Sequence, residues 1–441
     1  MEKERIHLIF MGLLVAAVAI AMTATTSQAV TTINFWHAMS GKRLPAVEKI
    51  VNGFNAAHPD IKVEAQFMGK YKEVIAKTIA AVKAGKPPHI AQVYEVGLQT
   101  MLDSGVILPV HEIFKPGEVD FGDVVGPIRD YYSVKGNLYS MPFNSSTAMT
   151  YYNKDLFRKA GLDPNNPPTT YKELEEVGKK LVGSGVVPNA FSTGWPSWIM
   201  EQAHAYHNQY FANNENGRRA RATQVYFNRP FGVKYAETMT RFHKEKVYIY
   251  GGREYSANKS FLAQQIAMLI QSTSSVGSIE AAAKGKFDLG TTFLPKFPEY
   301  SKGNSVIGGA TLWVLKGHPK KDYDAIKEFL KWTMRPEVTM QWHKDSGYFP
   351  TTNTALKKLM DEGWFSEHPN HLTAFMQILS GVKTPRSQGV RLGNFVEIRN
   401  IAQTALEKSF SGAASPKAAL DEGANEANRV LKEYNELYKK K

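Results

Sequence analysis

The alternation of strand-like and helix-like segments near the amino terminus constrains the fold of this chain more than any other feature. Residues 31–39, 61–67 and 89–96 have the short apolar or alternating patterns of strands. Between them, residues 44–54 and 71–82 carry apolar side chains at helical spacing. This order predicts parallel strands joined by crossover helices. Ligands bind such open sheets beyond the carboxyl ends of the strands.

The third predicted strand ends in a carboxylate. In "HIAQVYEVG", residues 89–97, Glu95 follows an apolar run and lies two residues before a glycine. A carboxylate that is buried at a strand end needs hydrogen-bonding partners. Because ligands bind at this edge of a sheet, Glu95 is a candidate ligand-binding residue.

A second unit is predicted to begin near residues 141–143. These residues and 148–153 are strand-like, and Thr170 followed by Glu173 forms a capping box that starts a helix. Residues 266–275 form an apolar strand that ends in a cluster of hydroxyl side chains. The chain has 441 residues, which is longer than a single hydrophobic core usually supports. We therefore expect two domains.

Residues 1–29 are predicted to be a secretory signal peptide. An apolar run from Leu8 to Met22 precedes "TTSQAV", and cleavage is expected after Ala29. The run is shorter than the about 20 residues that a membrane span needs. The absence of cysteine excludes disulfides and a lipid anchor on a cleavage-site cysteine. We therefore expect a periplasmic protein that is not anchored to the membrane.

We interpret the formal net charge of +13 first as a solvated surface studded with lysine. Lysine and arginine are spread along the chain and mixed with acidic residues, so that no block resembles a nucleic-acid-binding arm. A positive field still attracts a small anion.

The sequence offers little catalytic chemistry. Glu201, His204 and His207 share one helix face at a spacing that could hold a metal, but we interpret them as a polar surface. His368 and His371 are expected in a loop. The chain contains none of the motifs HExxH, P-loop, GxSxG or GxGxxG. We therefore predict no metal, no cofactor and no enzymatic activity.

Polar and aromatic side chains gather instead at the ends of predicted elements. Such stretches are "NSST", "STGWPSW", "QSTSS", "GYFP" and "RLGNFVEIRN". Hydroxyl groups, indole faces and one or two arginines are the parts of a non-covalent site for a small polar molecule.

The stretch "YYNKDLFRKAGLDPNNPPTTYKEL", residues 151–174, resembles the extracellular solute-binding proteins of ABC importers, the maltose-binding-protein-like family. The segments "FWHAM", "QVYEVG", "PFNSST", "GWPSW", "IGGATLWV", "WHKDSGYFP" and "RLGNFVEIR" resemble, in order, the members that bind sn-glycerol-3-phosphate. The resemblance covers nearly all of the chain after residue 29.

The resemblance implies an α/β, two-lobed periplasmic-binding-protein fold. Each lobe would be a mostly parallel sheet flanked by helices, with a ligand cleft between the lobes that closes on the ligand. The first lobe would comprise residues 30–142 and 306–349, and the second would comprise residues 143–305 and 350–441. The closed protein, expected to be a monomer, would dock on the permease subunits of an ABC importer.

The resemblance also implies the ligand-binding residues, position by position. Arg399 is expected to bind the phosphate with two hydrogen bonds, and Glu95 to accept hydrogen bonds from the hydroxyls at the opposite, glycerol end. In the hydroxyl cluster, any of residues 273–275 could replace Ser272. The full predicted set is Tyr71, Glu95, Ser146, Trp195, Trp198, Ser272, Gly309, Tyr348 and Arg399.

The predicted function is therefore the capture of sn-glycerol-3-phosphate for an ABC importer. Whether glycerophosphodiesters such as glycerophosphocholine also fit depends on the space beside the two tryptophans and stays open. One alternative is the same fold binding a neutral oligosaccharide. A remote alternative is a secreted hydrolase acting on phosphodiesters.

Overall fold

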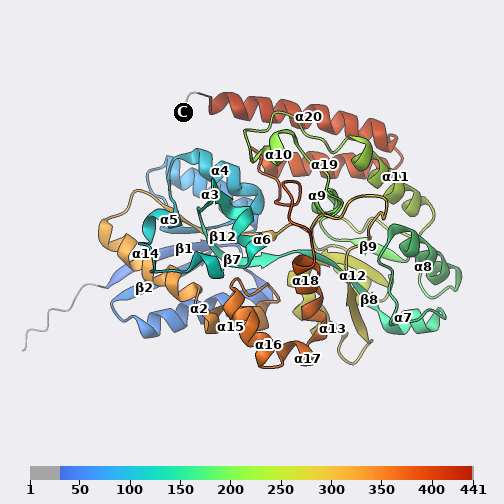
Figure 1. The fold of residues 1–441 in the computed structure, drawn as a ribbon, viewed down its shortest axis with the longest axis horizontal. Coiled ribbons are helices and arrows are strands. Elements are labelled where there is room, and N and C mark those ends of the chain that lie inside the picture. Colours follow the sequence, from blue (N-terminus) through green and yellow to red (C-terminus); the bar gives the residue numbers. More distant parts are fainter. Residues whose placement is uncertain (1–29, 440–441) are drawn as a thin grey trace, which may run out of the picture.

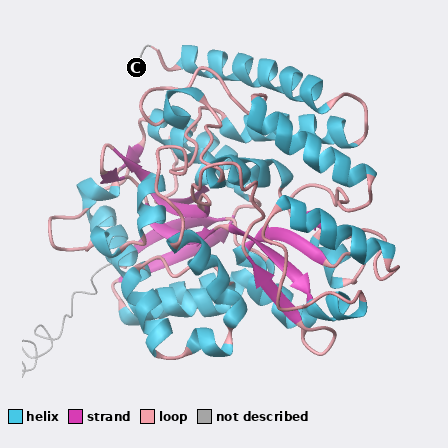
Figure 2. Ribbon diagram, turned by 45° about the vertical axis from the view of Figure 1, so that its right-hand side comes forward, coloured by secondary structure: helices cyan, strands magenta, loops and turns pink. Residues whose placement is uncertain are grey.

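The computed structural model describes residues 30–439. The predicted signal peptide, residues 1–29, lies outside the described residues. The described chain forms two β-sheets side by side, each covered by helices (Figure 1). Figure 2 shows the strands of both sheets enclosed by helices and loops.

The first sheet is built from both the amino-terminal part and the middle of the chain. It has six strands in the order β2-β1-β3-β12-β4, and β7 also pairs with β12. β1 pairs in parallel with β2 and β3, whereas β12 is antiparallel to β3, β4 and β7. All strands except β12 therefore run in one direction. The strands are β1 (Thr31–His37), β2 (Ile61–Phe67), β3 (Ile90–Tyr94), β4 (Ile107–Leu108), β7 (Met141–Ser146) and β12 (Gly308–Leu315).

The second sheet also has a single reversed strand. Its order is β11-β8-β10-β9, where β9 and β10 are parallel and β8 is antiparallel to both β10 and β11. The strands are β8 (Ala148–Asn153), β9 (Phe191–Thr193), β10 (Met268–Ser272) and β11 (Leu289–Thr292). A separate two-stranded ribbon pairs β5 (Ser133–Val134) with β6 (Asn137–Leu138).

The predicted α/β class with two mostly parallel sheets is confirmed, because each sheet has only one strand that runs against the others. The reversed strands, β8 and β12, are the ones that the chain enters after leaving the other sheet. The first crossing lies at Thr147, between β7 and β8, whereas the sequence predicted it after residue 142. Most of the segment "NSST", which lies between the two strand-like stretches of the sequence, extends β7. The complete lobe limits stay a prediction.

The helices cover the outer faces of the two sheets. In the first half of the described chain they are α2 (Leu44–Ala57), α3 (Tyr71–Lys83), α4 (Leu98–Ser104), α5 (Val110–Ile113), α6 (Gly126–Tyr132), α7 (Lys154–Lys159), α8 (Tyr171–Gly183), α9 (Pro196–Tyr206) and α10 (Asn213–Gly217). In the second half they are α11 (Pro230–Lys244), α12 (Asn258–Leu262), α13 (Val276–Ala283), α14 (Lys320–Thr333), α15 (Pro336–Ser346), α16 (Asn353–Asp361), α17 (Trp364–Glu367), α18 (Pro369–Leu379), α19 (Phe395–Phe410) and α20 (Pro416–Leu437).

Two predicted strands end earlier than expected and continue as 3₁₀ turns. β3 stops at Tyr94, and Glu95 begins the turn η2 (Glu95–Gly97). β10 stops at Ser272, before the turn η4 (Thr273–Ser275). Each turn leads directly into a helix, so the polar residues at both strand ends lie near helix amino termini, where partial positive charge accumulates.

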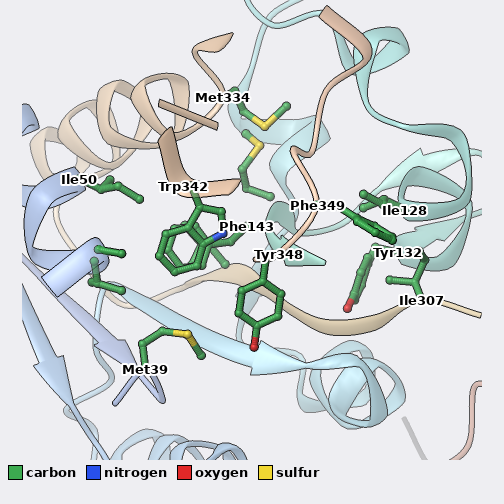
Figure 3. Packing of buried hydrophobic residues seen from close by; sticks show 14 of the residues in the cluster. Met39, Ile50, Ile128, Tyr132, Phe143, Ile307, Met334, Trp342, Tyr348 and Phe349 are labelled. Atoms are coloured by element: carbon green, nitrogen blue, oxygen red, sulfur yellow. The ribbon is translucent and has the colours of Figure 1, made fainter. Parts of the chain in front are cut away.

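The core of the first sheet holds Tyr348 in place. Trp342 stacks on Phe143 at 4.8 Å between ring centroids, and Tyr348 lies parallel to Trp342 at 5.9 Å. Figure 3 shows the Tyr348 hydroxyl directed away from these two rings. The ring is buried in the apolar cluster, while the hydroxyl is available to the site described below.

Among residues 30–439, no helix combines the length and the apolar character that crossing a membrane requires.

Candidate ligand-binding site

All nine residues predicted as ligand-binding line one cavity. The space between its walls amounts to about 370 Å³, including space open to solvent. Elements of both sheets contribute its walls. The lining residues are Tyr71, Tyr94, Glu95, Ser146, Trp195, Trp198, Tyr255, Ser272, Ser274, Gly308, Gly309, Tyr348 and Arg399.

Strand direction explains why residues far apart in sequence meet here. Glu95, Ser146 and Ser272 lie at the carboxyl ends of β3, β7 and β10, and Gly308 and Gly309 lie at the amino end of the reversed strand β12. The carboxyl ends of parallel strands share one edge of a sheet, and a reversed strand brings its amino end to the same edge. Glu95 therefore lies at the sheet edge where the sequence pattern placed it.

Five of the hydroxyl-bearing residues that line the cavity are called the hydroxyl cluster here. The Tyr71 and Tyr348 hydroxyls lie 3.0 Å apart, and Asn144 Nδ2 donates to the Tyr71 oxygen at 2.8 Å. Burial raises the pKa of Tyr71, so this hydroxyl keeps its proton at neutral pH. Since the Tyr71 oxygen accepts from Asn144, its own proton can be donated to Tyr348 or to a ligand. The members are Tyr71, Ser146, Ser272, Ser274 and Tyr348.

The serine part of this cluster narrows an alternative that the sequence had left open. Ser272 Oγ and Ser274 Oγ lie 2.9 Å apart, and both residues line the cavity. Thr273 and Ser275 do not line it, and Thr273 Oγ1 instead accepts from the Thr147 N–H at 3.1 Å. Ser272 and Ser274 are therefore the two hydroxyl residues of this segment that line the cavity, and which of them contacts a ligand stays a prediction.

Arg43 is a cationic residue that sequence reasoning missed. It ends the short turn η1 (Gly41–Arg43), and its Nη2 donates to Ser274 O at 2.8 Å and to Ser274 Oγ at 3.1 Å. Its guanidinium carbon lies 5.1 Å from the ring centroid of Tyr348 and 5.7 Å from that of Tyr255. Arg43 therefore contacts the hydroxyl cluster through Ser274, lines the wider cavity described below, and joins the first sheet's side to the second. A turn residue in the run "SGKRL" gave no signal that could have identified it.

Glu95 and Arg399 form an ion pair with a second buried carboxylate, Glu201, and we call these three residues the ion-pair network. Arg399 Nη1 donates to Glu95 Oε1 at 2.6 Å, and Arg399 Nη2 and Nε donate to Glu201 Oε2 at 2.6 and 3.1 Å. All three side chains are buried. Burial raises the pKa of Glu201. Burial alone would lower the pKa of Arg399, but the neighbouring carboxylates Glu201 and Glu95 raise it, and the net result is a raised pKa.

This contact corrects the roles that the sequence predicted for Glu95 and Arg399. The sequence placed them at opposite ends of the ligand, but they touch each other. The guanidinium of Arg399 is already engaged by two carboxylates, so it does not present a free two-pronged phosphate site. Glu201 was interpreted as part of a polar helix surface, yet α9 buries it against α19.

The neighbouring histidines of α9 also differ from expectation. His204 and His207 are buried, and each ring Nδ1 contacts the carbonyl oxygen four residues earlier, at 2.7 and 2.6 Å. The Nε2 of His207 accepts from the Phe297 N–H at 2.7 Å. Burial lowers the pKa of both histidines to about 4, so they are neutral core residues rather than a solvated face.

The two tryptophans border the cavity in different ways. Trp195 precedes α9 in the left-handed conformation at φ +50°, and its ring meets that of Tyr255 edge-on at 5.3 Å. Trp198 is buried, and within the described residues its Nε1 has no hydrogen-bond partner. A Cβ at Gly308 would lie only 2.6 Å from the Trp198 ring, so glycine is needed for this indole to reach the cavity wall.

Gly309 is required by the backbone itself. Its φ is +96°, and an added Cβ would lie 1.9 Å from the carbonyl oxygen of Asn144. Both facts restrict this position to glycine. The predicted role of its N–H as a ligand contact stays a prediction.

A wider cavity continues from the site towards solvent, and we call it the mouth. It shares Tyr71, Tyr94, Trp195, Tyr255 and Arg399 with the inner cavity. Lys70 Nζ and Glu254 Oε2 form an ion pair of 2.7 Å among its lining residues. Lys70 is the N-cap residue of α3, on the first sheet's side. Glu254 belongs to a loop whose backbone groups form hydrogen bonds with the second sheet's side.

Comparisons with known proteins agree with this architecture. A model of the family described as bacterial extracellular solute-binding protein matches residues 49–373. The sn-glycerol-3-phosphate-binding periplasmic protein UgpB of Yersinia pseudotuberculosis is 36% identical over 431 residues, covering 96% of this chain and 98% of that protein. UgpB of Escherichia coli K12 is 36% identical over 418 residues, covering 94% and 95%.

Solved structures share the fold at lower identity. UgpB from Mycobacterium tuberculosis in complex with glycerophosphocholine superposes with a TM-score of 0.76 at 21% identity, covering 92% of this chain and 99% of that chain. The cyclic alpha-maltosyl-1,6-maltose binding protein from Arthrobacter globiformis gives 0.74 at 22% identity, covering 92% and 100%.

These matches confirm the predicted family and the prediction of a binding protein rather than an enzyme. The periplasmic relatives imply the same compartment for this chain, and the family implies a small-molecule ligand and a permease as partners. With a family match over most of its length and relatives that align almost end to end, the chain belongs to the bacterial extracellular solute-binding proteins of ABC importers.

Proposed function

We propose that this protein captures sn-glycerol-3-phosphate in the inner cavity and delivers it to the permease of an ABC importer. Residues 1–29 would direct its export, and it would act as a monomer. The observation that carries the proposal is the presence of two chemically different groups in one cavity, the hydroxyl cluster with Arg43 beside it and the ion-pair network.

The hydroxyl cluster suits a phosphate. A phosphate monoester carries about −1.5 to −2 charges at neutral pH and offers three acceptor oxygens. Tyr71, Ser146 and Ser272 can each donate an O–H, and Arg43 adds a positive charge beside them. Hydrogen bonds to a charged group contribute about 1.5–3 kcal/mol each, so several neutral donors can hold this anion without a free arginine in the cavity wall.

The ion-pair network suits the two adjacent hydroxyls of glycerol. Glu95 lines the cavity and can accept a hydrogen bond, while Arg399 lines it and can donate one. Glu201 lies behind Arg399 and fixes the guanidinium. A neighbouring acceptor and donor match a diol, whose two oxygens can each donate and accept. The carboxylate also repels a phosphate placed at this side, which sets the orientation of the ligand.

Glycerophosphodiesters are a second ligand class that we propose. A diester needs room for the head group beyond the phosphate. The mouth adjoins Tyr71 of the hydroxyl cluster and encloses about 1170 Å³, including space open to solvent. Its aromatic residues Trp195, Tyr94 and Tyr255 offer faces that attract a quaternary ammonium head group such as choline.

Calorimetric titration of the mature protein tests the proposal. Sn-glycerol-3-phosphate and glycerophosphocholine should each release or absorb heat with one site per chain. Maltose and inorganic phosphate should bind much more weakly, because neither pairs a phosphate with a diol. Heat with maltose alone would contradict the proposal and favour a neutral oligosaccharide as ligand. Release of choline from glycerophosphocholine during the titration would instead indicate a hydrolase.

A further inference from the structure

Three potential metal ligands meet away from the ligand cavity. Glu280 of α13, His368 at the amino end of α18 and His371 within α18 each offer one ligand atom, and these atoms all lie within 4.8 Å of one another. His371 Nε2 lies 3.1 Å from Glu280 Oε2. The sequence separated Glu280 from both histidines by about ninety residues, and the expected loop at His371 is a helix.

The surroundings of these residues are arranged as they are around bound metals. Asn370 Nδ2 donates to the other oxygen of Glu280, Oε1, at 3.0 Å and so fixes the carboxylate. His371 is buried, and its Nδ1 has no hydrogen-bond partner among the described residues. Metal-bound histidines usually donate their second ring N–H to an acceptor. A buried nitrogen without a partner therefore needs an explanation.

The imidazole of His343 packs beside His371 and also has a ring nitrogen without a hydrogen-bond partner among the described residues. His343 Nδ1 lies 2.7 Å from the Tyr348 carbonyl oxygen and must carry the proton, which leaves Nε2 as an acceptor. This Nε2 is also buried without a partner among residues 30–439. The two rings lie 5.2 Å apart between centroids. If His371 binds a metal through Nε2, its Nδ1 carries the proton, and the neighbouring His343 ring has an acceptor nitrogen that is not otherwise used.

A second group of three possible ligands fails the same test. His89, His318 and Asp322 also converge, but His89 Nδ1 accepts from the Asn34 N–H at 3.1 Å. His89 Nε2 must then carry the proton, which it can donate to Asp322 Oδ2 at 3.2 Å. A neutral imidazole cannot accept at Nδ1 and bind a metal at Nε2 together. This group is explained by hydrogen bonding alone.

We propose that Glu280, His368 and His371 bind a zinc ion, with water as the fourth ligand. Two imidazoles and one carboxylate are a ligand set that zinc accepts in tetrahedral geometry, whereas calcium and magnesium prefer oxygen ligands. The metal replaces the proton shared between His371 and Glu280 and joins α13 to α18. It thereby stabilises the packing of α18 on the second sheet, where α18 contacts β8 and β11.

Titration of the chelator-treated mature protein with Zn²⁺ tests this site. One ion per chain should bind, and the midpoint of thermal unfolding should rise with Zn²⁺ but not with Mg²⁺. H368A and E280Q should abolish this binding, and N370A should weaken it by about 10–100-fold, as loss of an outer-shell partner does. Co²⁺ in place of Zn²⁺ should give the visible absorption of a tetrahedral complex.

A matched control is H58A, which also removes a partly exposed histidine stacked on an aromatic ring, here Phe54 at 4.2 Å. His368 stacks on Trp364 at 3.7 Å. H58A should keep full Zn²⁺ binding. Zn²⁺ binding of equal strength in H368A and E280Q, or no binding by the unmodified protein, would overturn the proposal. H368A changes a partly exposed side chain, so the variant is expected to fold. Its thermal unfolding transition without metal verifies this.

Discussion

Replacing Arg399 with methionine is expected to destabilise the protein by about 3–5 kcal/mol, the usual cost of removing one partner from a buried ion pair. The substitution leaves Glu95 and Glu201 buried without the cation that holds both. Ligand binding should be lost as well, because Arg399 lines the cavity and fixes Glu95. Urea unfolding at neutral pH measures the first effect and calorimetry the second.

The pH dependence of Arg399→Met gives a second readout. Burial already raises the pKa of Glu201, and removing the guanidinium, which acts to lower it, raises the pKa of Glu201 in the folded state further above its unfolded value. The folded state then binds more protons than the unfolded state at intermediate pH, so stability rises as pH falls towards 5. The deficit relative to the unmodified protein should therefore shrink between pH 7 and pH 5.

Arg429→Met is the matched control for this prediction. Arg429 also bridges two glutamates, Glu426 and Glu433, but on the exposed surface of α20. Exposed ion pairs contribute about 0–1 kcal/mol, so the control should be nearly neutral. The double variant Glu95→Gln/Glu201→Gln in the Arg399→Met background should recover stability. An Arg399→Met protein as stable as the Arg429→Met protein would show that the ion-pair network is not a buried, coupled group.

Replacing Arg43 with methionine is expected to weaken sn-glycerol-3-phosphate binding by about 10–100-fold. The estimate corresponds to the loss of one charge-assisted contact of about 1.5–3 kcal/mol. Arg43 orients Ser274 through two hydrogen bonds and places its charge beside Tyr348. Calorimetry should show the loss for every phosphate-containing ligand, because the effect acts on the phosphate and not on the glycerol.

Arg253→Met serves as the control for Arg43→Met. Arg253 lines the mouth but is engaged by Glu407 at 2.6 Å and does not contact the hydroxyl cluster. Its replacement should change the affinity for sn-glycerol-3-phosphate by less than about twofold, as expected for an exposed, paired charge. Equal losses in both variants would mean that only the general field of the protein attracts the ligand, and that Arg43 has no specific place at the phosphate.

The sequence predicted the edge of the sheets at which the site lies because strand order and strand direction follow from local patterns. Glu95 was assigned to this edge from an apolar run that stops at a polar residue, and the structure places it there. Tyr71 begins a helix that the spacing of Ile75, Ile79 and Val82 predicted. Local patterns were sufficient for the strand end at Glu95 and for the helix start at Tyr71, whereas the choice of Tyr71 as a site residue came from the family resemblance.

The sequence could not predict contacts between residues that only the tertiary fold brings together. Arg399 and Glu95 are 304 positions apart, and no local pattern shows that a helix of the second half faces the end of β3. The reversed strands β8 and β12 look like any other apolar strand. Arg43 stands in a polar turn, where an arginine is ordinarily solvated, so its contact with Ser274 becomes visible only in the folded chain.

The central claim is that Glu95 recognises the glycerol hydroxyls while the hydroxyl cluster holds the phosphate. The most direct test is a cycle of four calorimetric affinities, sn-glycerol-3-phosphate and propyl phosphate binding to the unmodified protein and to Glu95→Gln. Propyl phosphate keeps the phosphate and lacks both hydroxyls. Loss of the hydroxyls should weaken binding far more in the unmodified protein than in the variant, with a coupling of about 1.5–3 kcal/mol. A coupling near zero would contradict the claim, because Glu95 would then not sense the hydroxyls at all.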